Sequence, residues 1–263
     1  SLSVTDIGRF PCTAHARNDK PGTSASDSCI RATSGLNRGR LCRAPLHPYT
    51  AHVNPTRIFL IRHALVEPSA RLTMYGTLDV ALCQLALAQE AASYRWLASR
   101  LPQPARWFIT PLSRTRFTAE AIFAAGYPDA DLTLLPDLIE QDLGEWQGLP
   151  HEVFAERLLQ RPHPFWSIAS DERPPGGESF ADVVARVGPA IERLSADHAG
   201  EDLVIVAHGG SIRAAIAHVM EIPPAAALAF SIRNLSLSRL ERERGAWRVA
   251  AVNEEPFTLP ATP

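Results

Sequence analysis

Two histidines of this sequence stand directly after apolar runs, in positions where their side chains could do chemistry. The run 58–61 (Ile-Phe-Leu-Ile) ends in the pair Arg62-His63, and the run 203–207 ends in His208. Short apolar runs rich in β-branched residues predict buried strands. Ligands of an open α/β sheet bind outside the carboxyl ends of its strands, so both histidines are expected at one sheet edge, where they can meet.

Two further features favour binding of an anion at that edge. Gly209-Gly210 followed by Ser211 predicts a tight turn into a helix, whose first N–H groups form an anion site. The stretch 110–119 (Thr-Pro-Leu-Ser-Arg-Thr-Arg-Phe-Thr-Ala) also follows a strand and opens a helix. Arg114 falls in the first turn of that helix and can point back toward the strand ends, whereas Arg116 cannot face the same way. We therefore expect Arg114 in the site and Arg116 as a supporting or solvated charge.

Composition excludes several other classes of function. The chain has 263 residues and a formal charge of −2, so nothing global indicates binding of nucleic acid or of an anionic membrane. No apolar run is long enough for a membrane span, and the first 30 residues lack the apolar core of a signal peptide, which predicts a cytoplasmic protein. The four cysteines form no C-x-x-C pair, so neither a zinc site nor a disulfide framework is expected.

The chain divides into three parts by its pattern of apolar residues. Residues 1–55 carry seven cations against three acids and show no helical or strand period, which predicts a disordered or artefactual extension. Residues 56–255 form the expected ordered domain, and residues 256–263 a disordered tail. Within the domain, strands are expected at 106–110 and 132–135, helices at 81–101, 112–125 and 151–160, and a loop at 161–177.

The last third of the domain completes the predicted architecture. Ser179 and Asp182 form a capping box that opens a helix reaching His198. The strand and helix around His208 follow, and the runs 235–240 and 247–252, separated by a charged turn, predict a closing hairpin. Alternating strands and helices with a terminal hairpin predict a three-layer α/β/α sandwich around a mixed, mainly parallel sheet.

With these residues in place, the sequence resembles the histidine phosphatase superfamily, the phosphoglycerate mutase-like proteins. The resemblance covers about 200 residues and rests on five motifs in the family's order. These are R-H at 62–63, T-P-L-S-R-T-R-F-T-A at 110–119, L-x-E-x-x-x-G-x-W-x-G at 138–148, P-P-G-G-E-S at 174–179 and A-H-G-G at 207–210. The chain is most similar to the small bacterial phosphatases related to α-ribazole phosphatase.

The resemblance implies cleavage of a phosphate monoester through a phosphohistidine. It makes neutral His63 the nucleophile and Glu140 the general acid and then base. Arg62, Arg114 and a protonated His208 would surround the phosphoryl oxygens, with bidentate contacts from the arginines. Further substrate contacts are expected from Gly209, Ser113 and Glu178, and Asn234 resembles a rim position of the family. No metal or cofactor is expected, and the implied partner is a small phosphate ester bound by a monomer or homodimer.

The sequence also departs from the family pattern near the first histidine. The usual glycine after R-H is Ala64, which restricts the backbone there, and the usual Glu-Thr pair is Leu65-Val66 with only a displaced Glu67. If Glu140 is not the acid, then Glu67, Asp142 or Glu178 would have to serve. Trp146 is expected to pack against the wall of the site.

Three alternatives to a phosphatase remain open at this stage. A phosphoglycerate mutase would need to exclude water, for which the family uses longer insertions than a domain of this length offers. A catalytically idle module that binds a phosphate ligand would not need both histidines and both arginines. A metallohydrolase is disfavoured because two central arginines repel a divalent cation and no carboxylate cluster is evident.

Overall fold

The structure is a computed structural model in which residues 54–256 are described. The disordered extension and tail predicted at 1–55 and 256–263 lie outside this range, except for their innermost residues. None of the helices among the described residues has the length and apolar character needed to cross a membrane.

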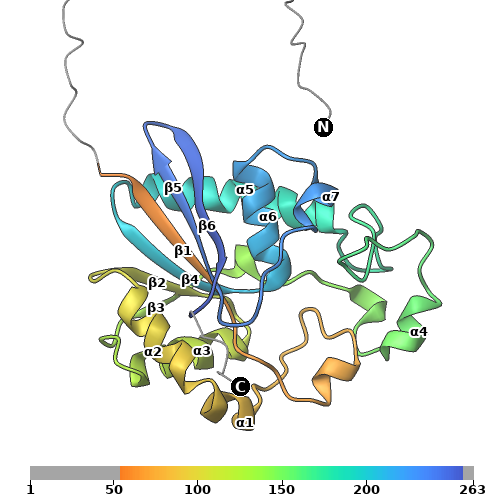
Figure 1. The fold of residues 1–263 in the computed structure, drawn as a ribbon. Helices are drawn as coiled ribbons and strands as arrows, with labels where there is room; N and C mark the ends of the chain where they lie inside the picture. The colour runs from red at the N-terminus through yellow and green to blue at the C-terminus, as the bar shows by residue number, and fades with distance from the viewer. Residues whose placement is uncertain (1–53, 257–263) are drawn as a thin grey trace, which may run out of the picture. The chain divides into compact units, whose positions relative to one another are not determined.

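A six-stranded sheet organises the described residues, and its first four strands in space are parallel. In spatial order the strands are β3 (Leu132–Leu134), β2 (Arg106–Ile109), β4 (Asp202–Ala207), β1 (Thr56–Arg62), β5 (Leu237–Glu243) and β6 (Ala246–Glu254). β5 runs antiparallel to β1 and continues into β6 through a turn at Arg244 and Gly245, both with positive φ. The predicted mixed, mainly parallel sheet and its closing hairpin are confirmed (Figure 1).

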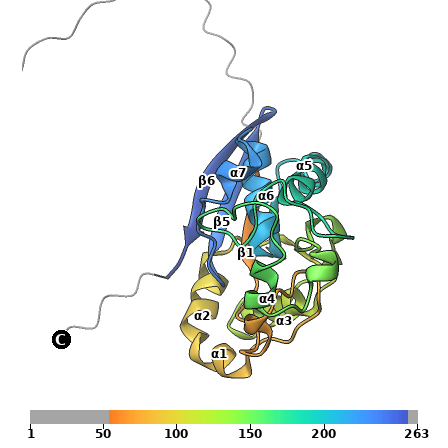
Figure 2. The same cartoon turned by 90° about the vertical axis from the view of Figure 1, so that its right-hand side faces the viewer.

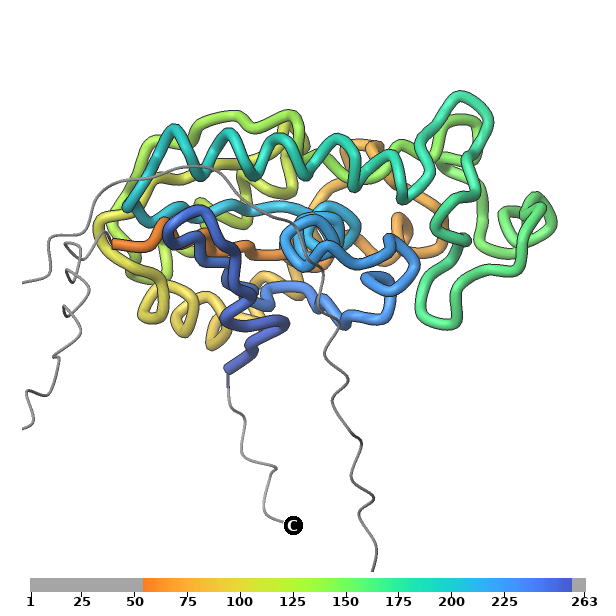
Figure 3. Tube along the Cα trace, turned by 90° about the horizontal axis from the view of Figure 1, so that it is seen from above, coloured from red at the N-terminus to blue at the C-terminus, as the bar shows by residue number. Residues whose placement is uncertain are grey.

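Alternating side chains along the central strands build a hydrophobic core on each face of the sheet. Ile58 and Leu60 of β1 pack on the side of the helices α5 (Phe180–Asp197) and α6 (Gly209–Val219). Phe59 and Ile61 pack on the side of α2 (Ala91–Arg100) and α3 (Ser113–Ala124). Figure 3 shows α5 along one side of β1 and β4 and α2 along the other. Successive side chains of a strand point to opposite faces of the sheet, so a helix layer on each face is needed to bury β1. The predicted three-layer sandwich is confirmed.

Two predicted helices differ from those in the structure. The helix expected at 81–101 is divided into α1 (Gln84–Gln89) and α2, with Glu90 between them at a ψ of 16°. It also starts later, because Cys83 N–H donates to Leu65 O and residues 81–83 pair with 65–67 instead. The helix expected at 151–160 ends at residue 155 as α4 (His151–Ala155). The amides of residues 159 and 160 donate to the buried Glu172 carboxylate, which holds this segment against the following loop.

The second half of the domain agrees with the prediction more closely. Ser179 and Asp182 form the capping box that opens α5, which ends one residue before His198. Figure 2 shows α5 and α6 beside the sheet, with β6 at its outer edge. The short elements α7 (Pro224–Ala227), η1 (Ala70–Leu72), η2 (Pro136–Leu138) and η3 (Gly144–Trp146) complete the described chain and were not predicted.

Candidate active site

His63 lies directly after β1 and is fixed in one tautomer by its own backbone. Its side chain is 1% exposed, and its Nδ1 lies 2.7 Å from Ala64 O. A carbonyl oxygen can only accept, so Nδ1 carries the proton and Nε2 keeps its lone pair. Asn234 Nδ2 donates to His63 O over 2.7 Å, which holds the backbone at this point. His63 is therefore presented as a neutral imidazole with a free Nε2.

The motif starting at residue 110 supports the same segment. Ala64 N–H donates to Thr118 Oγ1 over 2.9 Å, and Thr118 Oγ1 donates to Arg114 O. Ala64 is fully buried and is not among the described residues with positive φ. The alanine in place of the family's glycine is thus accommodated without backbone strain.

His208, the N-cap of α6, lies next to His63 as the sequence predicted. The two ring centroids are 5.2 Å apart, and His208 Nε2 lies 2.9 Å from Thr110 Oγ1, while the buried Nδ1 has no partner. Burial, and after it the charge of Arg114, hold the pKa of each histidine well below the ordinary imidazole value. The ligand-free site therefore favours a neutral His208, because a buried imidazolium would lie among arginines without a compensating anion. The protonated His208 expected beside a bound phosphoryl group stays a prediction.

Arg114 is buried completely and points back from α3 toward the strand ends, as predicted. Its Nη1 and Nη2 donate to Leu78 O and Gly76 O over 2.7 and 2.8 Å, and its buried Nε has no partner. Burial lowers the pKa of Arg114. One N–H of each terminal nitrogen holds a carbonyl, so Nε–H and the second N–H of each terminal nitrogen remain as donors for an anion. Arg116, by contrast, is exposed.

Arg62 is also held by a backbone carbonyl and has a buried Nε without a partner among the described residues. The carbonyl is Ile232 O, to which Nη1 donates over 2.7 Å. A Cβ at Gly209 would lie 3.5 Å from Arg62 Cζ, so the first residue of α6 passes close to this guanidinium. Arg62, Arg114 and the two histidines thus present unpartnered polar atoms in one place.

Glu140 reaches the N-terminus of α6. Its Oε2 accepts from Gly210 N–H over 3.1 Å and its Oε1 from Gln141 N–H over 3.0 Å. A Cβ at Gly210 would lie 2.2 Å from Glu140 Oε1, so only glycine leaves room for the carboxylate. The Gly210 amide, which we expected to face an anion, is occupied by Glu140 here. The carboxylate stands at the helix end where negative charge is favoured.

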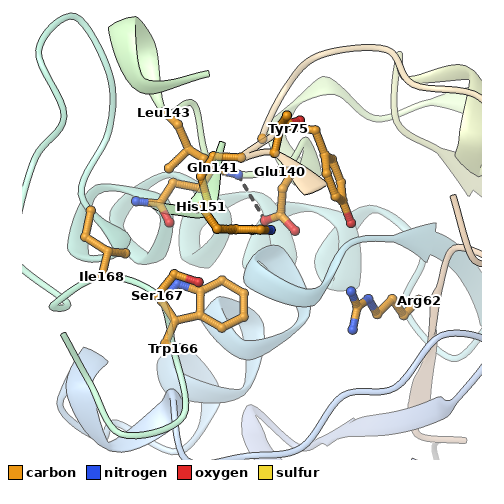
Figure 4. Close-up of a pocket in the computed structure, with 12 residues that line it drawn as sticks. Arg62, Tyr75, Glu140, Gln141, Leu143, His151, Trp166, Ser167 and Ile168 are labelled. Atoms are coloured by element: carbon orange, nitrogen blue, oxygen red, sulfur yellow. Dashed lines mark hydrogen bonds between the residues drawn. The ribbon is translucent and has the colours of Figure 1, made fainter. Parts of the chain in front are cut away.

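A pocket opens between Glu140 and Arg62 (Figure 4). It is lined by residues 73–76, by Gln141 and Leu143, by His151, and by residues 166–168 of the Pro-rich arm, which we define as residues 161–177. Trp146, expected at the wall of the site, is buried behind it against Leu143 and Ile168. His151 is exposed and also lines this pocket.

Two predicted substrate contacts have other partners in the structure. Ser113 N–H and Oγ both donate to Asp79 Oδ1 over 2.8 Å, which ties down the start of α3. Glu178 forms an ion pair with Arg186 and accepts from Asp142 N–H. Neither lines the pocket beside Glu140, and their contact with substrate stays a prediction. Of the alternative acids, the Asp142 carboxylate accepts from Gly144 N–H and the Glu178 carboxylate holds the contacts above, whereas Glu140 lines the pocket.

Sequence reasoning missed several residues that hold the site together. Arg213 Nε donates to Phe230 O and Nη1 to Gly209 O, and its guanidinium lies 4.5 Å from the Trp166 ring centroid. Burial lowers the pKa of Arg213 to about 10. Thr110 and Thr118 belong to a motif that was recognised, but their hydroxyls were not assigned. A buried polar position within a motif is the signal that could have found them.

The search for a metal centre gives a negative result for residues 54–256. No group of three or more His, Cys, Asp or Glu side chains in that range could hold a metal ion. The positively charged groups around His63 fit an anion instead.

The chain was compared with known families and proteins. The sequence description of the histidine phosphatase superfamily, branch 1, matches residues 58–255. A bifunctional protein of Mycobacterium tuberculosis is 34% identical over 158 residues, which cover 60% of this chain and 42% of that protein. The chain thus spans less than half the length of this relative.

Two other relatives have names that state an activity. A metal-independent phosphoserine phosphatase of Arabidopsis thaliana is 32% identical over 163 residues, covering 60% of this chain and 66% of that enzyme. A 2,3-bisphosphoglycerate-dependent phosphoglycerate mutase of Methylocella silvestris is 31% identical over 170 residues, covering 64% of this chain and 82% of the mutase. A mutase of comparable length exists, so chain length alone does not separate the two activities.

Solved structures show the same fold. A mycobacterial glucosyl-3-phosphoglycerate phosphatase has a TM-score of 0.65 at 28% identity, covering 76% of this chain and 99% of that one. An α-ribazole phosphatase from Shigella flexneri has a TM-score of 0.63 at 20% identity, covering 78% of this chain and all of that one. The second likeness is one of fold only.

Proposed function

Since this chain belongs to the histidine phosphatase superfamily, branch 1, we propose that it hydrolyses small organic phosphate monoesters through a phosphohistidine on His63. The observation that carries the proposal is the tautomer of His63, whose Nδ1 bonds Ala64 O and whose Nε2 is free. A pKa well below the ordinary imidazole value keeps this nitrogen unprotonated at neutral pH. A buried nucleophile surrounded by unpartnered guanidinium N–H groups supports attack on a phosphorus atom.

In the first half-reaction, Nε2 of His63 attacks phosphorus and the bond from phosphorus to the ester oxygen breaks. Charge on the equatorial oxygens is met by the Nε–H groups of Arg62 and Arg114. The departing alkoxide takes a proton from Glu140, which must enter this step protonated. An arriving phosphate dianion also supplies the negative charge that the empty site lacks, so His208 can take up a proton and donate to it.

In the second half-reaction, water replaces the departed alcohol. Glu140, now ionised, takes a proton from the water as its oxygen attacks phosphorus. The bond from phosphorus to Nε2 breaks, phosphate leaves and His63 returns to its neutral state. The Gly210 N–H bond keeps the Glu140 carboxylate at the same place in both steps.

Metal independence follows from the groups that surround the phosphoryl site. The central positive charges are guanidinium groups that would repel a divalent cation, and they supply the charge stabilisation that a metal supplies elsewhere. The similarity to a relative named metal-independent supports this part of the proposal. Activity should survive excess EDTA and be inhibited by vanadate, whereas loss with EDTA and rescue by a divalent cation would contradict it.

The mutase is the second candidate, favoured by the mutase relative and its comparable length. A mutase returns the phosphoryl group to another hydroxyl and must keep water out. Two of the residues that line the pocket beside Glu140, His151 and Ser167, are exposed, which supports access of water. Retention of His63, His208 and both arginines speaks against an idle binding module.

The test is a product analysis with the purified chain. Phosphate released from p-nitrophenyl phosphate and from a panel of metabolite monoesters, including α-ribazole 5′-phosphate, would support hydrolysis. Isomerisation of 3-phosphoglycerate in the presence of 2,3-bisphosphoglycerate, with little phosphate released, would establish the mutase instead. His198→Asn is a control, because His198 lies at the end of α5 and should leave either activity unchanged.

A further inference from the structure

The pocket beside Glu140 has two aromatic walls, each backed by a fixed arginine. Arg114 lies 5.5 Å from the centroid of the Tyr75 ring, and Arg213 lies 4.5 Å from that of Trp166. Each guanidinium donates to two backbone carbonyls, so neither can swing away from its ring. Tyr75 and Trp166 lie on either side of the Glu140 carboxylate in the view of Figure 4. Both rings are half-buried and line the pocket, so part of each aromatic surface is available to a ligand.

The remaining walls carry little charge. Met74, Leu143 and Ile168 are apolar, and Gln141 Nε2 is already bonded to Glu178 O. Among the described residues that line the pocket, Arg62 is the one with a permanent positive charge, and the proposed reaction uses it for the phosphoryl group. Glu140 adds a carboxylate. A second anionic group on the substrate would therefore find repulsion and no cation partner here.

The leaving group must enter this pocket and no other. General acid assistance requires Glu140 within hydrogen-bond reach of the departing oxygen, and Glu140 lines this pocket. A neighbouring cavity on the other side of Arg62, lined by Glu90, Arg213 and Arg233, lacks Glu140. An alcohol bound there would leave without a proton donor.

From these contacts we propose that the substrate is a monoester of an uncharged alcohol that bears a ring, held by stacking on Trp166 and Tyr75. The enzyme selects against esters whose alcohol carries a carboxylate, in contrast to the phosphoserine and glucosyl-3-phosphoglycerate named for similar proteins. This inference rests on the proposed hydrolase activity and adds the chemical class of its leaving group.

Three esters separate the two parts of the inference. The alcohol part of adenosine 5′-monophosphate is uncharged and bears rings. The alcohol part of glycerol 3-phosphate is uncharged and has no ring. 3-Phosphoglycerate has the same skeleton as glycerol 3-phosphate, with one CH₂OH group replaced by a carboxylate. Stacking of one ring predicts kcat/KM about tenfold or more higher for the adenosine ester than for glycerol phosphate. The unpaired carboxylate predicts a further loss of about tenfold for 3-phosphoglycerate.

Two neighbouring aromatic residues give matched variants. Trp166→Leu should remove most of the advantage of the adenosine ester over glycerol phosphate, while Phe165→Leu should retain it, because Phe165 is 71% exposed and does not line the pocket. Ser167→Arg should raise kcat/KM for 3-phosphoglycerate relative to glycerol phosphate by supplying the absent cation.

The outcomes are distinguishable. If 3-phosphoglycerate is hydrolysed as well as glycerol phosphate, or if Trp166→Leu lowers the adenosine and glycerol esters equally, the leaving-group class is wrong and the hydrolase stands. If no phosphate is released from any ester, p-nitrophenyl phosphate included, the proposed function and this inference both fail.

Discussion

The catalytic centre and the pocket beside it are built from different kinds of structure. His63, Thr110 and His208 follow the parallel strands β1, β2 and β4, and each is at most 1% exposed. Apart from Arg62 of β1 and His151 of α4, the residues that line the pocket lie outside the strands and α-helices, at 73–76, 140–141, 143 and 166–168, and Ser167 among them is exposed.

This difference suggests that the strand ends carry out phosphoryl transfer and that the loops select the substrate. Buried strand ends hold a few polar atoms with little freedom, which suits the transfer of a phosphoryl group between fixed partners. Loop residues can change in type without disturbing the sheet, which suits the choice of substrate. Variants of the centre should therefore reduce turnover of every ester, and variants of the pocket should change the ranking of esters.

Among variants that leave the nucleophile intact, the largest effect is expected from Glu140→Gln, which removes a proton donor. Acid–base assistance is worth about 10²–10⁴-fold, so turnover of alkyl esters should fall by that factor. p-Nitrophenolate leaves without a proton, so self-phosphorylation from p-nitrophenyl phosphate should fall much less. Pre-steady-state release of p-nitrophenol measures this step. Equal losses for both leaving groups would make Glu140 a binding residue.

Gly210→Ala should cause part of the same loss of turnover, although no catalytic side chain is substituted. The new methyl group would stand 2.2 Å from Glu140 Oε1 and must displace the carboxylate. We expect kcat on alkyl esters to fall by about 10–10²-fold, a fraction of the acid–base contribution. Gly188→Ala is the matched control, because its methyl group would meet His218 Nδ1 at 2.4 Å, on α5 away from the pocket. It should cost stability and leave kcat unchanged; equal kinetic losses would contradict the account.

Arg114→Lys tests whether the centre needs the guanidinium geometry or only a positive charge. Arg114 holds Gly76 O and Leu78 O and still presents Nε–H, which one ammonium group cannot do. Loss of a hydrogen bond to a charged group, at about 1.5–3 kcal/mol, predicts kcat/KM about 10–10²-fold lower for every ester. Arg116→Lys, at an exposed position of the same helix, should be neutral. A change in ester ranking instead would assign Arg114 to the pocket.

The smallest effect concerns stability and pH. In the folded chain the pKa values of His63 and His208 lie well below the ordinary imidazole value. Below about pH 6.5 the unfolded chain therefore binds protons at these histidines that the folded chain does not bind. The free energy of unfolding should therefore fall as pH decreases through that value, by up to about 1.4 kcal/mol per pH unit for each histidine. Urea unfolding at several pH values measures it. His63→Asn should reduce the slope and His198→Asn should not.

The same division explains what could be predicted from the sequence. Apolar runs and the glycines after His208 placed the strand ends, and periodic burial then required the helix layers. The late start of α1 and the early end of α4 arise from pairing with distant residues, 65–67 and Glu172, which no local pattern encodes. The neutral state of His208 follows from the combined burial and charges of the assembled site. Trp166 could be placed over the pocket from its position in the Pro-rich arm, but its pairing with Tyr75 could not, because the two residues are about 90 positions apart in irregular segments.

The most direct test of the central claim is the identity of the phosphorylated residue. Rapid quenching during turnover of a ³²P-labelled monoester should trap an acid-labile, alkali-stable phosphoenzyme, and mass spectrometry should place the phosphoryl group on His63. His63→Ala should form none and turn over no ester, while His198→Asn should form the normal amount. Two results would contradict the account. One is a phosphoenzyme that persists in His63→Ala. The other is label on another side chain together with activity that is retained in His63→Asn.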